Sequence, residues 1–296
     1  MVKFKKITPV NGFDSNDSNN AMQNNYAWSM AELGDYIYVG TGRNILYLAL
    51  GGLGLEVPKY LLPDPVDLNG EIWRYKKDGS KSWERVYKAP AELTIFGFRF
   101  MIQYTSPCGE TALYAGANTF KPQITLLKST DGVNWIPLVT TIQGTSTRSM
   151  EIHNNKLYMG VLSEIIGGKA LLYESTDPER KGWKLISFEG DPDKNPRGGI
   201  DNILSFNNKL YLATSPPGGF EVWRTKGREP CTNGWKLVVD KGAGDALNEI
   251  PLIFKKMGRH LYVGTAIAEA IVSVDPEKQF VPPKGADLIR IYKNDR

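Results

Sequence analysis

Short segments in which large apolar side chains alternate with small or polar ones recur along the whole chain. Alternation with a period of two over a few residues is typical of a half-buried β-strand. No segment shows sustained helical periodicity, so the pattern predicts an all-β chain. A tyrosine stands at the centre of each of the most similar segments, which are those around Tyr38, Tyr114, Tyr158, Tyr211 and Tyr262.

Each repeat of this pattern predicts four strands. An apolar run precedes the tyrosine segment and ends in a tight turn such as Asn154-Asn155 or Asn207-Asn208, because adjacent asparagines tolerate the positive φ of hairpin turns. A third strand follows, and in four repeats a fourth strand opens with a tryptophan. Four antiparallel strands about every 50 residues are typical of a β-propeller blade. The opening tryptophans are Trp83, Trp135, Trp183 and Trp235.

The fifth repeat has no fourth strand of its own, and the N-terminus offers a substitute. Residues 2–7 carry Phe4 where the other repeats have tryptophan, and residues 11–19 resemble residues 241–248. We therefore expect residues 2–7 to pair with residues 287–293, which would protect two sheet edges. The prediction is a single five-bladed β-propeller domain over 1–296, with four-stranded antiparallel blades and the N-terminal strand closing the last blade. The blades span about 25–90, about 95–142, about 146–190, about 197–241, and about 248–296 plus 2–8.

One turn carries a resemblance to a known group of propellers. The segment Ser129-Thr130-Asp131-Gly132-Val133-Asn134-Trp135 resembles the Asp-box, or BNR repeat, of sialidase-like β-propellers, and residues 78–83 and 175–183 resemble it more loosely. The resemblance implies a turn between the third and fourth strands, in which the aspartate caps backbone donors and the aromatic residue packs inside the blade. Five blades are also similar to tachylectin-like lectins. Trp28 stands where the sialidases need an arginine, so the resemblance implies an architecture and no particular activity.

The predicted architecture places a set of polar and aromatic residues at one end of a central channel. Inner strands line such a channel, and ligands usually bind at its concave mouth. Aligning the repeats on their tyrosines brings the starts of the inner strands to equivalent depth. The candidate residues at the mouth are Tyr26, Trp28, Arg99, Arg148, Arg197, Asp201 and Glu249.

These residue types support a ligand-binding interpretation. Tyr26 and Trp28 could stack on a sugar ring or another flat apolar face. Arg99 and Arg148 could bind a carboxylate or phosphate through their forked donors, and Arg197 lies in the loop beside them. We therefore expect a small-molecule or glycan ligand, recognised as a carbohydrate or a small anionic or flat group.

The carboxylates at the same mouth leave catalysis open. Asp201 and Glu249, assisted by Arg148 and Arg99, could form the carboxylate pair of a glycosidase-like hydrolase or a lyase. In the competing interpretation, Arg148 pairs with Asp201 and Arg99 with Glu249, which would only balance charges around a water-filled channel. Whether the protein is an enzyme stays undecided at this point.

Two insertions suggest a third function. Residues 42–70 and 266–285 interrupt the first and fifth repeats, and the first of them contains the apolar run Ile45–Leu50. Both are expected on the channel face, where they could cover a pocket or pack against a partner. A protein-interaction scaffold, or an oligomer formed through residues 42–70, is therefore the second alternative.

Composition narrows the classes of partner and cofactor. The formal charge is +4, and no concentrated basic face argues for nucleic acid. The most apolar segment, Ile45–Leu55, is roughly half as long as a membrane span, and no signal peptide is visible, which fits a cytoplasmic or a mature secreted protein. His153 and His260 fall in turns of the opposite face, so neither a metal nor another cofactor is predicted. Cys108 and Cys231 are expected as free thiols, with a disulfide as the alternative.

Overall fold

The computed structural model describes residues 5–52, 54–59, 62–162, 168–267 and 285–292. It divides into two compact units, Met1–Ser146 and Thr147–Arg296, and each is described by itself. Antiparallel strands are the main regular structure of both units, and the helices are few and short. The all-β prediction is confirmed.

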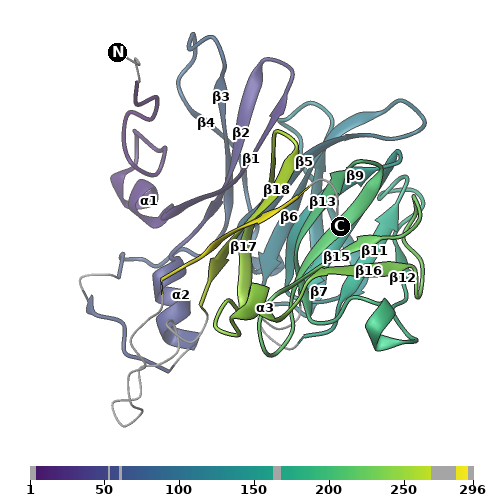
Figure 1. The fold of residues 1–296 in the computed structure, drawn as a ribbon. Coiled ribbons are helices and arrows are strands. Elements are labelled where there is room, and N and C mark those ends of the chain that lie inside the picture. Colours follow the sequence, from purple (N-terminus) through teal and green to yellow (C-terminus); the bar gives the residue numbers. More distant parts are fainter. Residues whose placement is uncertain (1–4, 53, 60–61, 163–167, 268–284, 293–296) are drawn as a thin grey trace. The chain divides into compact units, whose positions relative to one another are not determined.

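The first unit contains two antiparallel meanders (Figure 1), whose strands pair in the order in which they follow one another in the chain. A contact between Gly42 and Gly97 joins the two. The strands of the first meander are β1 (Tyr26–Leu33), β2 (Tyr36–Gly42), β3 (Glu71–Lys76) and β4 (Glu84–Lys88). Those of the second are β5 (Ile95–Thr105), β6 (Thr111–Thr119), β7 (Gln123–Ser129) and β8 (Ile136–Gln143). The helical segments are α1 (Ser18–Gln23), α2 (Ile45–Gly52) and η2 (Ala91–Leu93).

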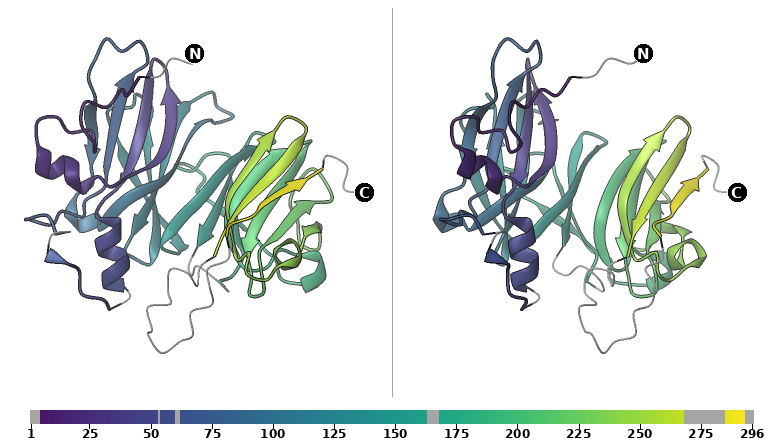
Figure 2. Two further views of the ribbon diagram at one scale, coloured as in Figure 1. Left: turned by 60° about the vertical axis from the view of Figure 1, so that its left-hand side comes forward. Right: turned by 90° about the vertical axis from the view of Figure 1, so that its left-hand side faces the viewer.

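The second unit continues the same antiparallel order, and the two views in Figure 2 let its strands be followed from teal to yellow. One meander is β9 (Ser146–His153), β10 (Lys156–Leu162), β11 (Leu171–Ser175) and β12 (Lys184–Ile186). The next is β13 (Gly199–Phe206), β14 (Lys209–Ser215), β15 (Glu221–Thr225) and β16 (Trp235–Val239). The last described strands are β17 (Ile250–Met257), β18 (His260–Ala266) and β19 (Leu288–Ile291). Two short helices, η3 (Pro192–Lys194) and α3 (Lys241–Gly244), lie in the connections.

The predicted hairpin turns are confirmed. Asn154 and Asn155 join β9 to β10 with φ values of 48° and 61°, and Asn207 and Asn208 join β13 to β14 with 50° and 57°. Positive φ at both central residues gives the turn a twist that matches the twist of the flanking strands. The asparagine pairs therefore set the register of these hairpins.

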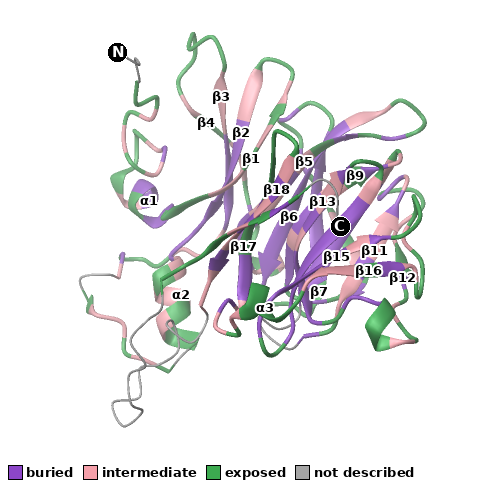
Figure 3. Cartoon of the chain, in the orientation of Figure 1, coloured by how far each residue is buried: buried purple, intermediate pink, exposed green. Residues whose placement is uncertain are grey.

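The core consists of the second strands of the meanders and the residues packed on them. Tyr38, Tyr114, Tyr158 and Tyr211 are all buried, and so are β10 and β14 over almost their whole length. Strand β6 is also almost entirely buried, as Figure 3 shows. The tryptophans of the repeats pack against these strands. Trp73, Trp135, Trp223 and Trp235 are buried, and Trp83 and Trp183 are partly buried.

The turn after β7 is held by one aspartate. Asp131 Oδ1 accepts hydrogen bonds from the backbone N–H groups of Val133 and Asn134, both at 2.8 Å. These bonds hold the pKa of Asp131 well below its usual range, because they stabilise the ionised carboxylate. The ring of Trp135, which closes the turn, meets Tyr38 edge-on with 6.3 Å between ring centroids.

The N-terminal segment differs in part from the expectation. Lys5–Ile7 form no strand, and the Trp83 indole donates a hydrogen bond to the Ile7 carbonyl at 3.0 Å. The rest of the expected strand, residues 1–4, lies outside the described residues, as does most of the insertion predicted over 266–285. This bond satisfies the Ile7 carbonyl, one of the groups that a strand would have paired.

The first insertion contains a helix that the periodicity analysis missed. Helix α2 has no buried residue, although its first six residues are all apolar. A helix that is apolar on every side has no amphipathic period, so sequence periodicity gives no signal for it.

Candidate functional site

The predicted ligand-binding residues of the first unit form a stack. Tyr26 and Trp28 lie on β1 with their ring centroids 6.0 Å apart, and Tyr26 is exposed. The guanidinium of Arg99, on β5, lies 5.0 Å from the centroid of the Trp28 ring. A cation–π contact of this kind orients the arginine and leaves its in-plane N–H donors pointing along the ring. Trp28 therefore holds Arg99 on its face, where the sequence analysis placed a sugar.

The predicted catalytic residues of the second unit pair with each other. Arg148, on β9, lies 3.1 Å from Asp201 Oδ1, on β13, and the Asp201 side chain is only 1% exposed. The Ser215 hydroxyl donates to the other carboxylate oxygen of Asp201. Arg148 and Asp201 thus form the ion pair that the charge-balancing interpretation expected, and a role in catalysis stays a prediction. Glu249, just before β17, is partly buried.

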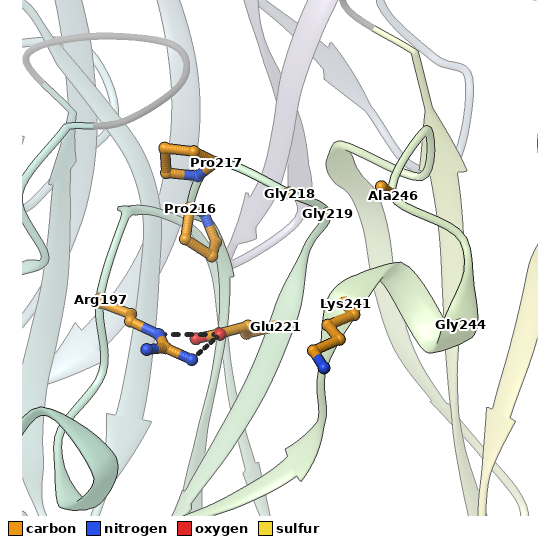
Figure 4. Close-up of a pocket in the computed structure, with 9 residues that line it drawn as sticks. All are labelled: Arg197, Pro216, Pro217, Gly218, Gly219, Glu221, Lys241, Gly244 and Ala246. Carbon is orange, nitrogen blue, oxygen red and sulfur yellow. Dashed lines mark hydrogen bonds and ion pairs between the residues drawn. The ribbon is translucent and has the colours of Figure 1, made fainter.

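A pocket of about 660 Å³ lies at the ends of β13, β14 and β15. Its most prominent polar feature is an arginine–glutamate pair (Figure 4), in which Arg197 Nε and Nη2 lie 2.9 and 2.7 Å from Glu221 Oε1. The Arg197 side chain is 50% exposed, whereas that of Glu221 is 5% exposed. The arginine is thus held from one side and open to the pocket on the other. The pocket is lined by Arg197, Pro216, Pro217, Gly218, Gly219, Glu221, Lys241, Gly244 and Ala246.

Two glycines let the loops around the pocket pack backbone against backbone. At Gly198 (φ +78°) a Cβ atom would lie 2.3 Å from the Pro216 nitrogen, and at Gly219 (φ +109°) one would lie 2.6 Å from the Gly242 nitrogen. The Phe220 N–H donates to the Asn248 carbonyl at 2.8 Å, which ties the same loop to the start of β17. The shape of the pocket is therefore fixed by main-chain contacts and needs little rearrangement to receive a ligand.

Acidic groups surround the arginine of the pocket. The hydrogen bond to Glu221 raises the pKa of Arg197, and the charges of Asp193 and Asp240 act in the same direction. Glu221 also accepts a hydrogen bond from the Trp223 indole at 2.8 Å. The pocket therefore presents donors and an acceptor side by side instead of a purely cationic surface.

The sequence analysis identified Arg197 but missed Glu221 and Lys241. The repeat pattern places Glu221 in a third strand and does not indicate a role for its side chain. A signal was present, since Glu71-Ile72-Trp73 repeats the same spacing in the first unit. A carboxylate that recurs two residues before a buried tryptophan needs a partner, because buried charges are almost always paired.

Other predicted features are also located. Cys108 and Cys231 form no disulfide. His153 is buried with Nδ1 2.8 Å from Ser205 Oγ and Nε2 2.7 Å from the Arg228 carbonyl, which is a structural arrangement. In the part of the chain that the structure describes, no group of three or more His, Cys, Asp or Glu side chains could hold a metal ion. None of the described helices has the length and apolar character needed to cross a membrane.

Comparisons with known proteins find matches among solved structures and none by sequence. No protein-family model matches the chain, and no curated protein matches it. Among matching solved structures is a luciferin-regenerating enzyme, with 14% identity, a TM-score of 0.48, and coverage of 89% of this chain and 75% of that one. An exo-β-1,3-galactanase from Phanerochaete chrysosporium with β-1,3-galactotriose has 9% identity, a TM-score of 0.46, and coverage of 80% and 55%. A GH43 β-xylosidase/α-arabinofuranosidase from a compost microbial metagenome, in complex with xylotriose, has 12% identity, a TM-score of 0.41, and coverage of 82% and 85%. At these scores no activity is carried over to this chain.

Proposed function

We propose that this protein binds a carbohydrate in the pocket formed by Arg197 and Glu221. The observation that carries the proposal is a half-exposed arginine, fixed by a nearly buried carboxylate, at the wall of a cavity of about 660 Å³. Pockets of this size hold small ligands, and a few well-placed polar groups give them orientation and specificity.

The chemistry of the wall suits sugar hydroxyls better than a simple anion. A hydroxyl both donates and accepts hydrogen bonds, and Arg197 beside Glu221 offers it both kinds of partner. Pro217 is exposed and adds an apolar surface for the C–H face of a ring. The neighbouring charges of Asp193 and Asp240 offset that of Arg197, which disfavours a strongly anionic ligand.

The fold that we propose for this function is the single five-bladed β-propeller described by the sequence repeat. It is supported by the regular order of antiparallel strands in the described residues and by the turn at Asp131, which has the contacts expected of an Asp-box. In this proposal β17, β18 and β19 belong to the last blade.

The binding proposal is tested by isothermal titration against a panel of neutral sugars, acidic sugars and small carboxylates. Arg197→Ala should weaken binding of the best sugar at least about tenfold, because a charged hydrogen-bonding group is lost. Arg259→Ala, an exposed arginine outside the pocket, is the matched control and should bind normally. Absence of binding across the panel would contradict the proposal. Product release from the same sugars, measured for the wild type and Asp201→Asn, decides whether the hydrolase alternative holds.

A second candidate function is supported by α2. Six consecutive apolar side chains, Ile45 to Leu50, lie on a helix with no buried residue, and Leu46 is 50% exposed. Exposed apolar surface of this kind marks an interaction site more often than a free surface. We propose self-association through this segment. Analytical ultracentrifugation of the wild type and Leu46→Glu checks it, and a monomer at all concentrations in both would contradict it.

A further inference from the structure

The turns that join first to second strands in the second unit differ in charge. Two of them are formed by the asparagine pairs at 154–155 and 207–208, which carry no charge. The third, between β17 and β18, spans residues 255–259, all of which are exposed, and it contains Lys255, Lys256 and Arg259. Because uncharged residues form the equivalent turn twice, the hairpin itself does not require the cations of the third turn.

A lysine directly follows each of the two asparagine pairs, and the chain treats the two lysines differently. Lys156 is neutralised, since its Nζ lies 3.0 Å from Glu174 Oε2 and 3.2 Å from Glu229 Oε2. Lys209 Nζ donates to the Gly227 carbonyl at 3.0 Å, a contact that fixes the ammonium group but leaves its charge. Positive charge therefore remains beside the second asparagine turn and is balanced beside the first.

The ring of Phe206 connects this charge to the third turn. Phe206 pairs with Lys209 across the β13–β14 hairpin, and Lys256 Nζ lies 5.6 Å from the centroid of the Phe206 ring. The charge of Lys255 acts on Glu151 of β9, but burial raises the pKa of that carboxyl to about 7, so it carries only part of a charge at neutral pH. Glu151 therefore offsets little of the positive charge of this surface.

An exposed apolar side chain lies among these cations. Met257 is 59% exposed and pairs with His260 across the turn, so it lies at the tip of the hairpin. Gly258 has a φ of 59°, which lets the chain reverse within two residues and leaves Met257 between Lys256 and Arg259. Cations around a flexible apolar tip suit a bilayer interface, where the cations meet phosphate groups and the apolar side chain enters below them.

We propose that the turn at residues 255–259 docks the protein on an anionic lipid surface. Each Lys or Arg close to such a surface strengthens adsorption roughly fivefold, and the attraction is screened within a Debye length. A nucleic acid would also attract the cations, but its phosphate contacts are polar and would leave Met257 without a role. The proposal goes beyond carbohydrate binding and does not depend on it, since none of these residues lines the sugar pocket.

The test measures co-sedimentation with vesicles of phosphatidylcholine alone and of phosphatidylcholine with an equal part of phosphatidylserine. We expect binding to the mixed vesicles only, weakened at least about tenfold when Lys256→Ala is combined with Arg259→Ala. Met257→Ser should also weaken it, although the net charge is unchanged. The matched control combines Lys121→Ala with Lys169→Ala. These exposed lysines precede β7 and β11, at the strand ends opposite to such turns, and their loss should leave vesicle binding unchanged.

Sugar titration and thermal unfolding of the same variants separate loss of docking from loss of the fold or of the sugar pocket. Arg259→Ala should keep its sugar affinity and lose roughly fivefold in vesicle affinity, and Arg197→Ala should do the reverse. Equal binding to both kinds of vesicle, or equal weakening by the two double variants, would overturn the proposal, because attraction would then not depend on this turn.

Two further results would overturn the choice of a bilayer as the partner. One is binding to a single-stranded oligonucleotide with no binding to either kind of vesicle. The other is an unchanged affinity of Met257→Ser for the mixed vesicles, because the apolar tip would then not enter the interface.

Discussion

The carboxylates Glu71 and Glu221 begin from the same local sequence and end in opposite environments. Both precede a buried tryptophan by two residues and bind its indole. Around Glu71 the space is filled by the chain itself, since Arg43 is fully buried and also contacts Asp67 at 3.0 Å. Around Glu221 the partner arginine is half exposed and a cavity remains.

The difference shows that the acid-x-tryptophan pattern places a hydrogen-bond acceptor at the start of the third strand. The pattern does not determine whether the chain itself or a ligand binds that acceptor. In the first unit, α1 inserts Asn20 ahead of Asn24, and Arg43 follows directly after β2, so the acceptor is saturated. In the second unit the loop before β13 supplies Arg197 and a close backbone contact at Gly198, and the loop between β14 and β15 supplies another at Gly219. Glu71 therefore has a structural role, whereas Glu221 is a candidate ligand contact.

The largest expected difference is in stability. Arg43→Ala should lower the unfolding free energy by about 3–5 kcal/mol, because it removes a fully buried guanidinium and leaves Glu71 and Asp67 with the partly exposed cations Arg85 and Lys88. Arg197→Asn should cost less than about 1 kcal/mol, because a half-exposed ion pair contributes little and asparagine can donate to Glu221 as Asn24 does to Glu71. Urea unfolding of both variants measures this contrast, and equal losses would show that the two sites are not different in kind.

A smaller effect is expected at the loop that shapes the open site. Gly219→Ala should cost about 2–3 kcal/mol, because it combines a positive φ with a backbone clash against Gly242. Gly218 is the matched control, since its φ is +91° but a Cβ there would meet nothing within 4 Å. Gly218→Ala should cost about 1–2 kcal/mol from the backbone conformation alone. Thermal unfolding of the Gly219→Ala and Gly218→Ala variants measures this difference. Equal losses of stability in the two variants would contradict the argument that Gly219 is needed for close backbone packing.

The smallest expected effect is the contribution of Asp67, beside Arg43 at the Glu71 site, to the acid dependence of stability. Burial works to raise the pKa of Asp67, but hydrogen bonds from Lys88 and the Asn69 N–H, together with the charge of Arg43, leave it below its ordinary value of 3.8. Because the folded pKa is depressed, this stabilisation is complete above the unfolded pKa and is lost as the pH falls through the folded one.

Asp67→Asn should therefore reduce the fall in stability below pH 4, by less than about 1 kcal/mol because the group is partly exposed. Urea unfolding at pH 3 and pH 7 in both proteins checks this. An unchanged pH dependence would assign the acid sensitivity to other carboxylates.

The comparison of the terminal loops shows how far a sequence match extends. Residues 11–19 were matched to residues 241–248, and both loops do have positive φ, at Gly12 and Phe13 and at Gly242 and Ala243. The contact that the two loops share is nevertheless made by Asn24. Its Nδ2 donates to the Gly12 carbonyl, and Asn248 Nδ2 donates to the Gly242 carbonyl. Helix α1 lengthens the first loop, so the match identified the turn and placed the asparagine too early.

What the sequence determined by itself is the succession of strands from β1 to β19, the asparagine hairpins and the tyrosines at the centres of the second strands. These depend on neighbours a few residues apart, and alternation records directly which side chains face the core. Only the tertiary structure decided which polar and charged side chains bind one another. Asn24 reaches Glu71 across 47 residues and Arg197 reaches Glu221 across 24, through loops whose course depends on glycine contacts and on an inserted helix. No local pattern encodes a contact between side chains so far apart in the sequence. The acid-x-tryptophan pattern therefore lies in a filled site in one unit and beside an open pocket in the other.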